Sequence, residues 1–218
     1  MKKRAPWIIA VLVAIAGYAF WVHGQEWLNP RPVTLSMDVD NNPGVPVVRR
    51  VEMNGFGFAD LRSTDVGDTG GLPYKSRWNN DLEFSLSWIE LYNKQAWQAH
   101  FTIPVEKLAA IDADRRHVRI KIKIGAGGDL RVATNHSEFL RLIRLQRSNE
   151  ITDDMRVDVV LEELCAQRLA DDDPIRKHLL RGLDKWAVGS MKKRRDFWIL
   201  ENPLPTSRCS SDWRLKDE

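Results

Sequence analysis

Residues 82–88 read Leu-Glu-Phe-Ser-Leu-Ser-Trp, and residues 97–103 read Trp-Gln-Ala-His-Phe-Thr-Ile. Apolar and polar side chains alternate in both stretches, which is typical of a β-strand with one buried face. The short polar stretch 92–95 lies between them. Two alternating strands joined in this way predict a β-hairpin. His100 falls on the polar side of its strand, so we expect a surface histidine there.

The same alternation recurs on both sides of the hairpin. It predicts strands over residues 33–39, 47–53, 118–124 and 129–133. Residues 40–44, Asp-Asn-Asn-Pro-Gly, and the run 125–128, Gly-Ala-Gly-Gly, predict turns between strands. Residues 33–134 are therefore expected to form a mainly antiparallel β-rich domain with one solvated face.

Residues 55–74 are rich in Gly, Asp, Ser and Thr, which predicts an irregular loop closed by Gly70-Gly-Leu-Pro73. Long loops on rigid sheets often carry recognition. We expect this loop and the neighbouring Trp78 to contact a partner. The expected polar contacts are Asp60, Arg62, Asp65 and Asp68. In the alternative, Trp78 packs in the core and the loop only connects strands.

Residues 135–200 predict a helical region that packs on the sheet. Asn135 is placed to cap a first helix that ends near Gln146, and Thr152 to cap a second. The apolar stripe of the second helix is Val157, Leu161, Leu164 and Cys165.

Asp173-Pro174 is a start signal for a third helix. Its apolar stripe is Ile175, Leu179, Leu183 and Trp186, with Gly189 at the C-terminal cap. Residues 197–200 predict a last strand, and residues 201–218 a polar tail. The expected fold class is α+β, with about three helices after the sheet.

The N-terminus predicts a membrane anchor. Lys2, Lys3 and Arg4 precede the uncharged stretch Ala5–Val22, which as a helix spans roughly 27 Å, close to one bilayer core. Residues 1–22 are therefore expected to cross the inner membrane once, with residues 23–32 as a stalk and the rest in the periplasm. The alternative is a signal peptide cleaved after Ala14-Ile-Ala16.

The chain has two cysteines, Cys165 and Cys209. In an oxidising compartment such a pair is a candidate disulfide. In the alternative, Cys165 is buried on a helix face and Cys209 lies in an unconnected tail.

No motif predicts an enzyme, a cofactor or a metal site. Residues 38–44 resemble a calcium loop, but Pro43 replaces the expected glycine and Arg49 the closing glutamate. The glycine run 125–128 lacks the Lys-Ser/Thr of a phosphate loop. Asp171–Asp173 is expected to cap a helix, Glu83 and Glu90 to make ordinary polar contacts, and the five histidines lack metal-ligand spacing. A net charge of +3 argues against nucleic acid as a partner.

Residues 53–104 resemble small envelope proteins of Gram-negative bacteria, mostly lipoproteins of uncharacterised domain families. The resemblance is carried by Asn54-Gly55, Gly70-Gly71, Leu72-Pro73, Trp78, Trp88, Trp97 and Pro104. Genes for such proteins often lie beside type VI secretion effectors, notably lipases. This chain differs in lacking a lipobox cysteine and in its anchor and long C-terminal region.

The resemblance implies an immunity protein that binds and blocks a periplasm-acting effector. Two alternatives remain from the residues alone. One is a structural or assembly subunit of an envelope complex, and the other is a hydrolase with an unrecognised site.

Overall fold

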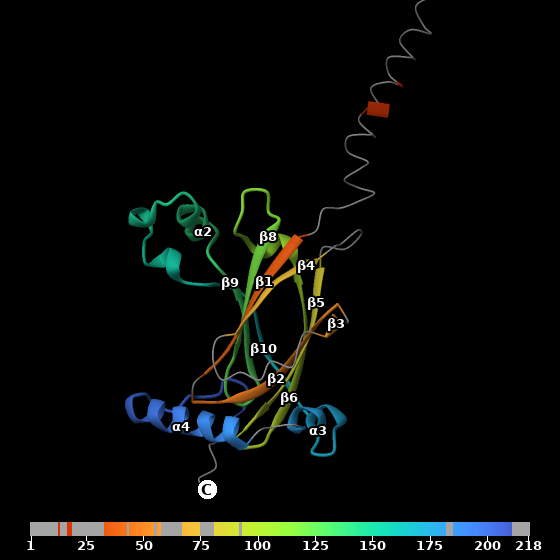
Figure 1. Cartoon of the computed structure of the whole chain (residues 1–218), viewed down its shortest axis with the longest axis vertical. Helices are drawn as coiled ribbons and strands as arrows, with labels where there is room; N and C mark the ends of the chain where they lie inside the picture. The colour runs from red at the N-terminus through yellow and green to blue at the C-terminus, as the bar shows by residue number, and fades with distance from the viewer. Residues whose placement is uncertain are drawn as a thin grey trace, which may run out of the picture.

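The chain folds into two β-sheets with helices at both ends (Figure 1). The computed structural model describes residues 13, 17–18, 33–42, 44–54, 56–57, 67–74, 81–91, 93–181 and 185–210. One sheet has the strand order β10-β9-β8-β1-β4, with β7 also paired to β8, and the other has the order β11-β6-β5-β2-β3. The strands are β1 (Val33–Asn41), β2 (Val47–Met53), β3 (Phe56–Gly57), β4 (Gly67–Tyr74), β5 (Asp81–Glu90), β6 (Ala96–Pro104), β7 (Ala109–Ala110), β8 (His117–Ile124), β9 (Asp129–Thr134), β10 (Val159–Cys165) and β11 (Gln167–Arg168).

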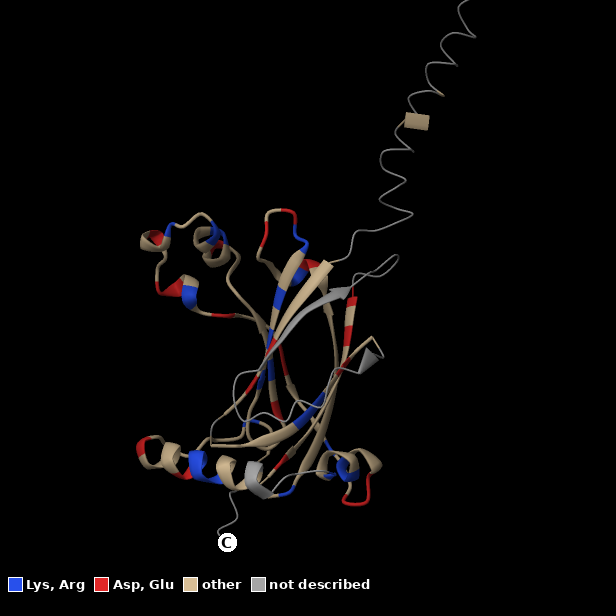
Figure 2. Cartoon of the chain, viewed as in Figure 1, with Lys and Arg blue, Asp and Glu red and all other residues tan. Residues whose placement is uncertain are grey.

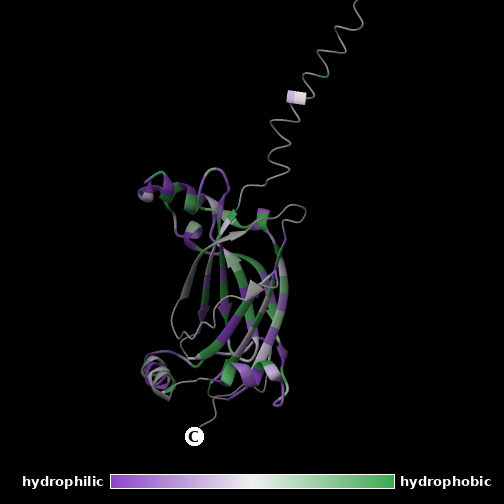
Figure 3. Cartoon of the chain, turned by 45° about the vertical axis from the view of Figure 1, so that its right-hand side comes forward, coloured by the Kyte–Doolittle hydropathy of each residue, from purple (hydrophilic) through white to green (hydrophobic). Residues whose placement is uncertain are grey.

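The inner faces of the two sheets share one hydrophobic core, because alternate side chains of each strand point between the sheets. Figure 3 shows this alternation as green and purple bands along the strands. The core contains the predicted apolar positions of β1, β5, β6 and β8, and Arg119, Lys121 and Lys123 lie on the outer face of β8. The predicted hairpin is confirmed: β5 pairs antiparallel with β6, and Trp88 stands opposite Trp97.

Among the described strands, the chain passes between the two sheets five times, at β1–β2, β3–β4, β4–β5, β6–β7 and β10–β11. Residues 42–46 lead from β1 to β2, and Ala166 separates β10 from β11. The prediction of mainly antiparallel pairing is confirmed, but β1 pairs in parallel with β8. The sequence carries no signal for that pair because its strands are far apart in the chain.

The prediction of an irregular loop over residues 55–74 is wrong in part. β3 pairs with β2, and β4 pairs with β1 along the edge of its sheet. The residues 70–73, expected to close the loop, lie inside β4. An edge strand tolerates Gly and Pro because one side of its backbone needs no ladder partner.

The predicted helix with the stripe Val157 to Cys165 is also wrong. Residues Val159–Cys165 form β10, which pairs with β9. The register shifts between Val160 and Glu162, so Leu161 is an extra residue of a β-bulge. The bulge lets Leu161 and Leu164, three residues apart, both pack on the core. In a bulged strand, the spacing of the core-facing residues can therefore equal the three-residue spacing that is typical of a helix.

The first predicted helix is confirmed as α2 (Ser137–Arg144), although His136 and not Asn135 takes the N-cap position. Short 3₁₀ turns follow: η2 (Ser148–Glu150) and η3 (Asp154–Arg156), while η1 (Val105–Lys107) precedes β7. The start of α3 (Pro174–Leu180) is as predicted, with the Asp173 carboxylate accepting from the Ile175 N–H at 2.7 Å.

The predicted end of the third helix is wrong. α3 ends at Leu180, and a separate helix, α4, spans Lys185–Glu201. Gly189, expected as a cap, lies inside α4, and so do residues 197–200, expected as a strand. α3 packs under β2 and β5, whereas α4 brings Trp198 against Gly44. The two helices pack on different surfaces, which explains why the structure has two helices where the sequence predicted one.

The predicted anchor and stalk lie outside the described residues, apart from residues 13, 17 and 18. Within the described part of the chain, no helix combines the length and apolarity needed to span a membrane. β1 begins at the end of the sandwich that carries α2, and α3 and α4 lie at the opposite end (Figure 1).

Candidate functional site

Most of the residues predicted to contact a partner lie outside the described residues. These are Asp60, Arg62, Asp65 and Trp78. Asp68 lies in β4, where its backbone pairs with Asp38 of β1. The predicted contact region therefore stays a prediction.

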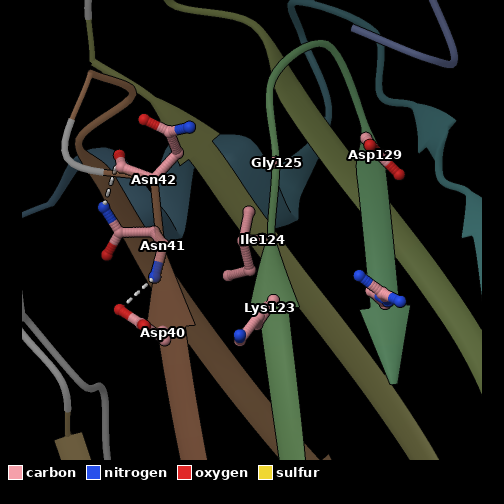
Figure 4. Close-up of a pocket in the computed structure, with 8 residues that line it drawn as sticks. Asp40, Asn41, Asn42, Lys123, Ile124, Gly125 and Asp129 are labelled. Atoms are coloured by element: carbon pink, nitrogen blue, oxygen red, sulfur yellow. Dashed lines mark hydrogen bonds between the residues drawn. The ribbon is translucent and has the colours of Figure 1, made fainter. Parts of the chain in front are cut away.

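The described residues form a hollow of about 280 Å³ where β1 and β8 end and β9 begins (Figure 4). Its lining consists of Asp40, Asn41, Asn42, Lys123, Ile124, Gly125, Asp129 and Arg131. Asp40, Asn41, Asn42 and Gly125 belong to the two stretches that were predicted as turns, 40–44 and 125–128, and the other four residues lie on the adjoining strands β8 and β9. Adjacent pairing of β1, β8 and β9 brings the turns side by side.

Ion pairs surround this hollow. Asp129 accepts from Arg208 at 2.7 Å, and Glu163 pairs with both Arg208 and Arg131. Lys123 lies 3.7 Å from the Asp158 carboxylate. Lys123, Asp129 and Arg131 at the hollow therefore each have a partner of opposite sign, and Figure 2 shows blue and red residues interspersed along the strands.

Of the calcium-like stretch 38–44, residues 38–41 lie in β1, and the predicted turn follows from Asn42. The Asp38 carboxylate is held by the Arg119 guanidinium at 2.6 and 2.9 Å. The Asn42 side-chain oxygen accepts from the Gly44 N–H at 2.9 Å, which closes an Asx-turn. Among the described residues, no three His, Cys, Asp or Glu side chains are placed to hold a metal ion.

The glycine turn 125–128 is held by a buried carboxylate. Glu90 is 1% exposed, and its Oε1 accepts from the Gly127 N–H at 2.7 Å and the Gly128 N–H at 3.4 Å. Gly127 and Gly128 have φ angles of 61° and 83°, the left-handed region that glycine adopts freely. The backbone amides that a phosphate loop would offer to a ligand are thus bound to Glu90.

The burial of two charged residues, Glu90 and Arg49, was not predicted from the sequence. Both continue an apolar alternation: Arg49 stands between Val47 and Val51, and Glu90 follows Trp88 by two residues. A charge in the apolar phase of a strand was the available signal, since inward positions repeat every second residue.

Cys165 and Cys209 form a disulfide, with an S–S distance of 2.07 Å. It ties the segment after α4 to the end of β10. The neighbouring Ser207 hydroxyl lies within hydrogen-bond distance of the Gly127 carbonyl at 3.5 Å. The C-terminal segment is therefore fastened to the same end of the sandwich as the hollow.

The described histidines are dispersed. His100 is exposed, as predicted, whereas His117, His136 and His178 are half-buried. The His117 Nε2 lies 2.6 Å from the Ser36 hydroxyl. His23 lies outside the described residues.

Exposed apolar side chains gather in two places. The first, which we name the α2–β10 face, consists of Ile143, Leu145, Val157, Val159 and Val160, with exposed fractions of 36 to 64%. α2 packs against η2 and η3, and β10 begins three residues after the end of η3, so these residues lie on or next to adjoining elements. The second group, Phe197, Leu200 and Leu204, lies on and after α4 at the opposite end.

No protein-family model, no curated protein and no solved structure matches this chain.

Proposed function

We propose that this is a periplasmic binding protein, anchored in the inner membrane by residues 1–22, that blocks a periplasm-acting effector. The observation that carries the proposal is the α2–β10 face. β10 is an edge strand that carries the exposed side chains of Val159 and Val160, with exposed Val157 just before it and exposed Ile143 and Leu145 at the end of α2. Exposed apolar groups on a sheet edge are a common basis of protein recognition.

The supporting chemistry favours binding over turnover. Lys123, Asp129 and Arg131, three of the four charged residues that line the hollow, are engaged in ion pairs, and the glycine-turn amides are bound to Glu90. Groups that are already paired in this way fix the shape of the surface and are not available to act on a substrate. The immunity role itself comes from the resemblance of residues 53–104 and is the narrower part of the proposal.

The interface is tested with substitutions that leave the core intact. Val157 is 64% exposed and precedes β10, so Val157→Asp should fold normally. We expect it to weaken binding to the effector encoded by the neighbouring gene at least tenfold, because a charge replaces a desolvated apolar contact. Leu204→Asp, 54% exposed at the opposite end, is the matched control and should bind as the wild type does. Equal binding by both variants would remove the α2–β10 face from the proposal.

The immunity role is tested in cells. Deleting this gene alone should sensitise cells to the neighbour's periplasmic product, and deleting both genes should be harmless. If cells lacking only this protein survive that product, the assembly-subunit alternative takes precedence. Trp78→Ala tests the second predicted contact region in the same assay.

A further inference from the structure

β10 leaves one edge of its sheet open. It is the terminal strand in the order β10-β9-β8-β1-β4, with β9 on one side and no described strand on the other. A strand in this position keeps a row of backbone N–H and C=O groups that can pair with a further strand. The side chains of β10 are mostly exposed, including Val159 at 41% and Val160 at 36%. The edge is therefore accessible from solvent.

The register shows which backbone groups of β10 face outward. The Gly125 N–H donates to the Asp129 carbonyl at 2.8 Å, so these residues form a hydrogen-bonded pair where β8 meets β9. Bonded and non-bonded pairs alternate along an antiparallel ladder, which makes Lys121 and Ala133 a bonded pair as well. Ala133 therefore uses its backbone groups on β8. Val160 stands opposite Ala133, so its own N–H and C=O point away from β9.

The open part of this edge is short. At the far end of β10, Arg208 pairs with Glu163 and Cys209 is bonded to Cys165, so the C-terminal segment is fastened there. The bulge at Leu161 interrupts regular pairing before that point. An added strand is therefore centred on Val160, next to the other members of the α2–β10 face.

The side chains along the open part define the chemistry of a strand that fits it. Successive residues of a strand point to opposite faces, so Val159 and Val160 offer apolar groups on both faces of the edge. Glu162 is exposed and has no ion-pair partner among the described residues, whereas Glu163 is held by two arginines. The complement is an apolar segment with a lysine or arginine beside Glu162.

A second copy of this chain does not meet that description. β10 contains Glu162 and Glu163 and no basic residue. Two copies of the strand side by side would bring the carboxylates of both into one short ladder, where like charges on opposed strands are destabilising. Charge therefore favours a different strand, one that carries a basic residue.

We propose that the effector adds an extended segment to the edge of β10 at Val160, with apolar side chains on both faces and a lysine or arginine that pairs with Glu162. The segment bonds to the outward N–H and C=O of Val160, and its apolar side chains contact Val159 and Val160. This inference rests on the proposed function, because it names the part of the effector that the α2–β10 face recognises.

The first experiment measures hydrogen exchange of single amides in the full-length protein in detergent, with the synthetic peptide Thr-Val-Val-Lys-Val-Thr. The Val160 N–H should exchange rapidly in the free protein and at least about tenfold more slowly with excess peptide, because the added strand supplies its acceptor. The Val159 N–H faces β9 and is the internal reference. The peptide Thr-Val-Val-Glu-Val-Thr is the matched control and should bind about two- to fivefold more weakly, since it places a carboxylate beside Glu162.

The second experiment compares two variants for binding to the product of the neighbouring gene. Val160→Pro removes the outward N–H, and proline is tolerated on a strand edge where that N–H faces solvent. It should weaken binding about tenfold, because a carbonyl of the added strand loses its donor. Val160→Thr is the matched control: it keeps the N–H and the β-branched shape and should bind within about threefold of the wild type.

The outcomes separate this inference from the proposed function. If the wild type and Val160→Pro bind the effector equally well, strand addition is overturned and the α2–β10 face remains an interface of side chains. If the wild type does not bind the effector, the proposed function fails, and the peptide experiment alone decides whether the edge accepts a strand. The exchange measurement on the wild type also decides if Val160→Pro does not fold. No protection of the Val160 N–H by the lysine peptide, or equal binding of both peptides, would overturn the inference.

Discussion

Arg49 shows how a single residue can be held in a place that its own chemistry disfavours. The seven-residue strand β2 has to pair with β5 along its whole length, and this register fixes the inward direction of Arg49. The surrounding core, and not the arginine, therefore determines its burial.

We predict that Arg49→Met stabilises the protein. Arg49 is 0% exposed, and burial lowers the pKa of its guanidinium to about 10, which shows that the core disfavours the charged form; methionine fills a similar volume without a charge. Replacement of buried charges by apolar groups has raised stability by about 1–4 kcal/mol elsewhere. Urea unfolding should show a higher midpoint for this variant. Arg50→Met is the control: Arg50 is the next residue of β2, half-buried and paired with Glu52, and its replacement should change stability by less than about 0.5 kcal/mol. A lower midpoint for Arg49→Met would mean that the guanidinium already has its acceptors.

A second prediction at this scale concerns Gly128. A Cβ there would lie 2.6 Å from the Trp97 ring, at a φ of +83°. Both the clash and the left-handed backbone oppose a side chain, so Gly128→Ala should destabilise the protein by about 2–4 kcal/mol. Gly189→Ala is the control: nothing lies within 4 Å of the added atom inside α4, and alanine should stabilise the helix by about 0.5–1 kcal/mol. Thermal unfolding of the two variants should move in opposite directions.

At the scale of elements, the sequence predicts strands well where alternation is uninterrupted. β5, β6 and β8 follow from residue types alone because each has one apolar and one polar face. β4 was missed because an edge strand of Gly and Pro shows no side-chain pattern, and β10 because its bulge mimics a helix. The hollow could not be predicted for a different reason: it requires the long-range parallel pair β1–β8, which no local pattern encodes.

The disulfide is the covalent link between elements, and its removal is the next prediction. Cys165 and Cys209 are separated by 44 residues, a loop that contains α3 and α4. In the chain-entropy model such a loop contributes about 4 kcal/mol. Cys209→Ser should therefore lower the unfolding midpoint, and proteolysis should cut first after α4. If both wild-type thiols label with maleimide in unfolded, unreduced protein, the bridge is absent from the native chain.

At the scale of the whole molecule, the two ends of the sandwich have different surroundings. The chain enters β1 at the end that carries α2 (Figure 1). With residues 1–22 as an anchor, the α2–β10 face would lie nearer the membrane than α4 does. The basic run 192–194 on α4 is exposed, and it would then face away from the inner membrane. This arrangement favours a solvated role for that run over contact with the lipids of the anchoring bilayer.

The last prediction tests this orientation. Lys2, Lys3 and Arg4 precede an uncharged stretch of membrane length, so they should stay in the cytoplasm and the C-terminus should be periplasmic. Alkaline phosphatase fused after Glu218 should be active, and the full-length protein should sediment with membranes. Replacing Lys2, Lys3 and Arg4 by glutamate should reduce this activity, because the orientation signal is lost, while the same change at Lys192, Lys193 and Arg194 should leave it unaltered. A soluble product that begins at Gly17 would show instead that the segment is a cleaved signal peptide.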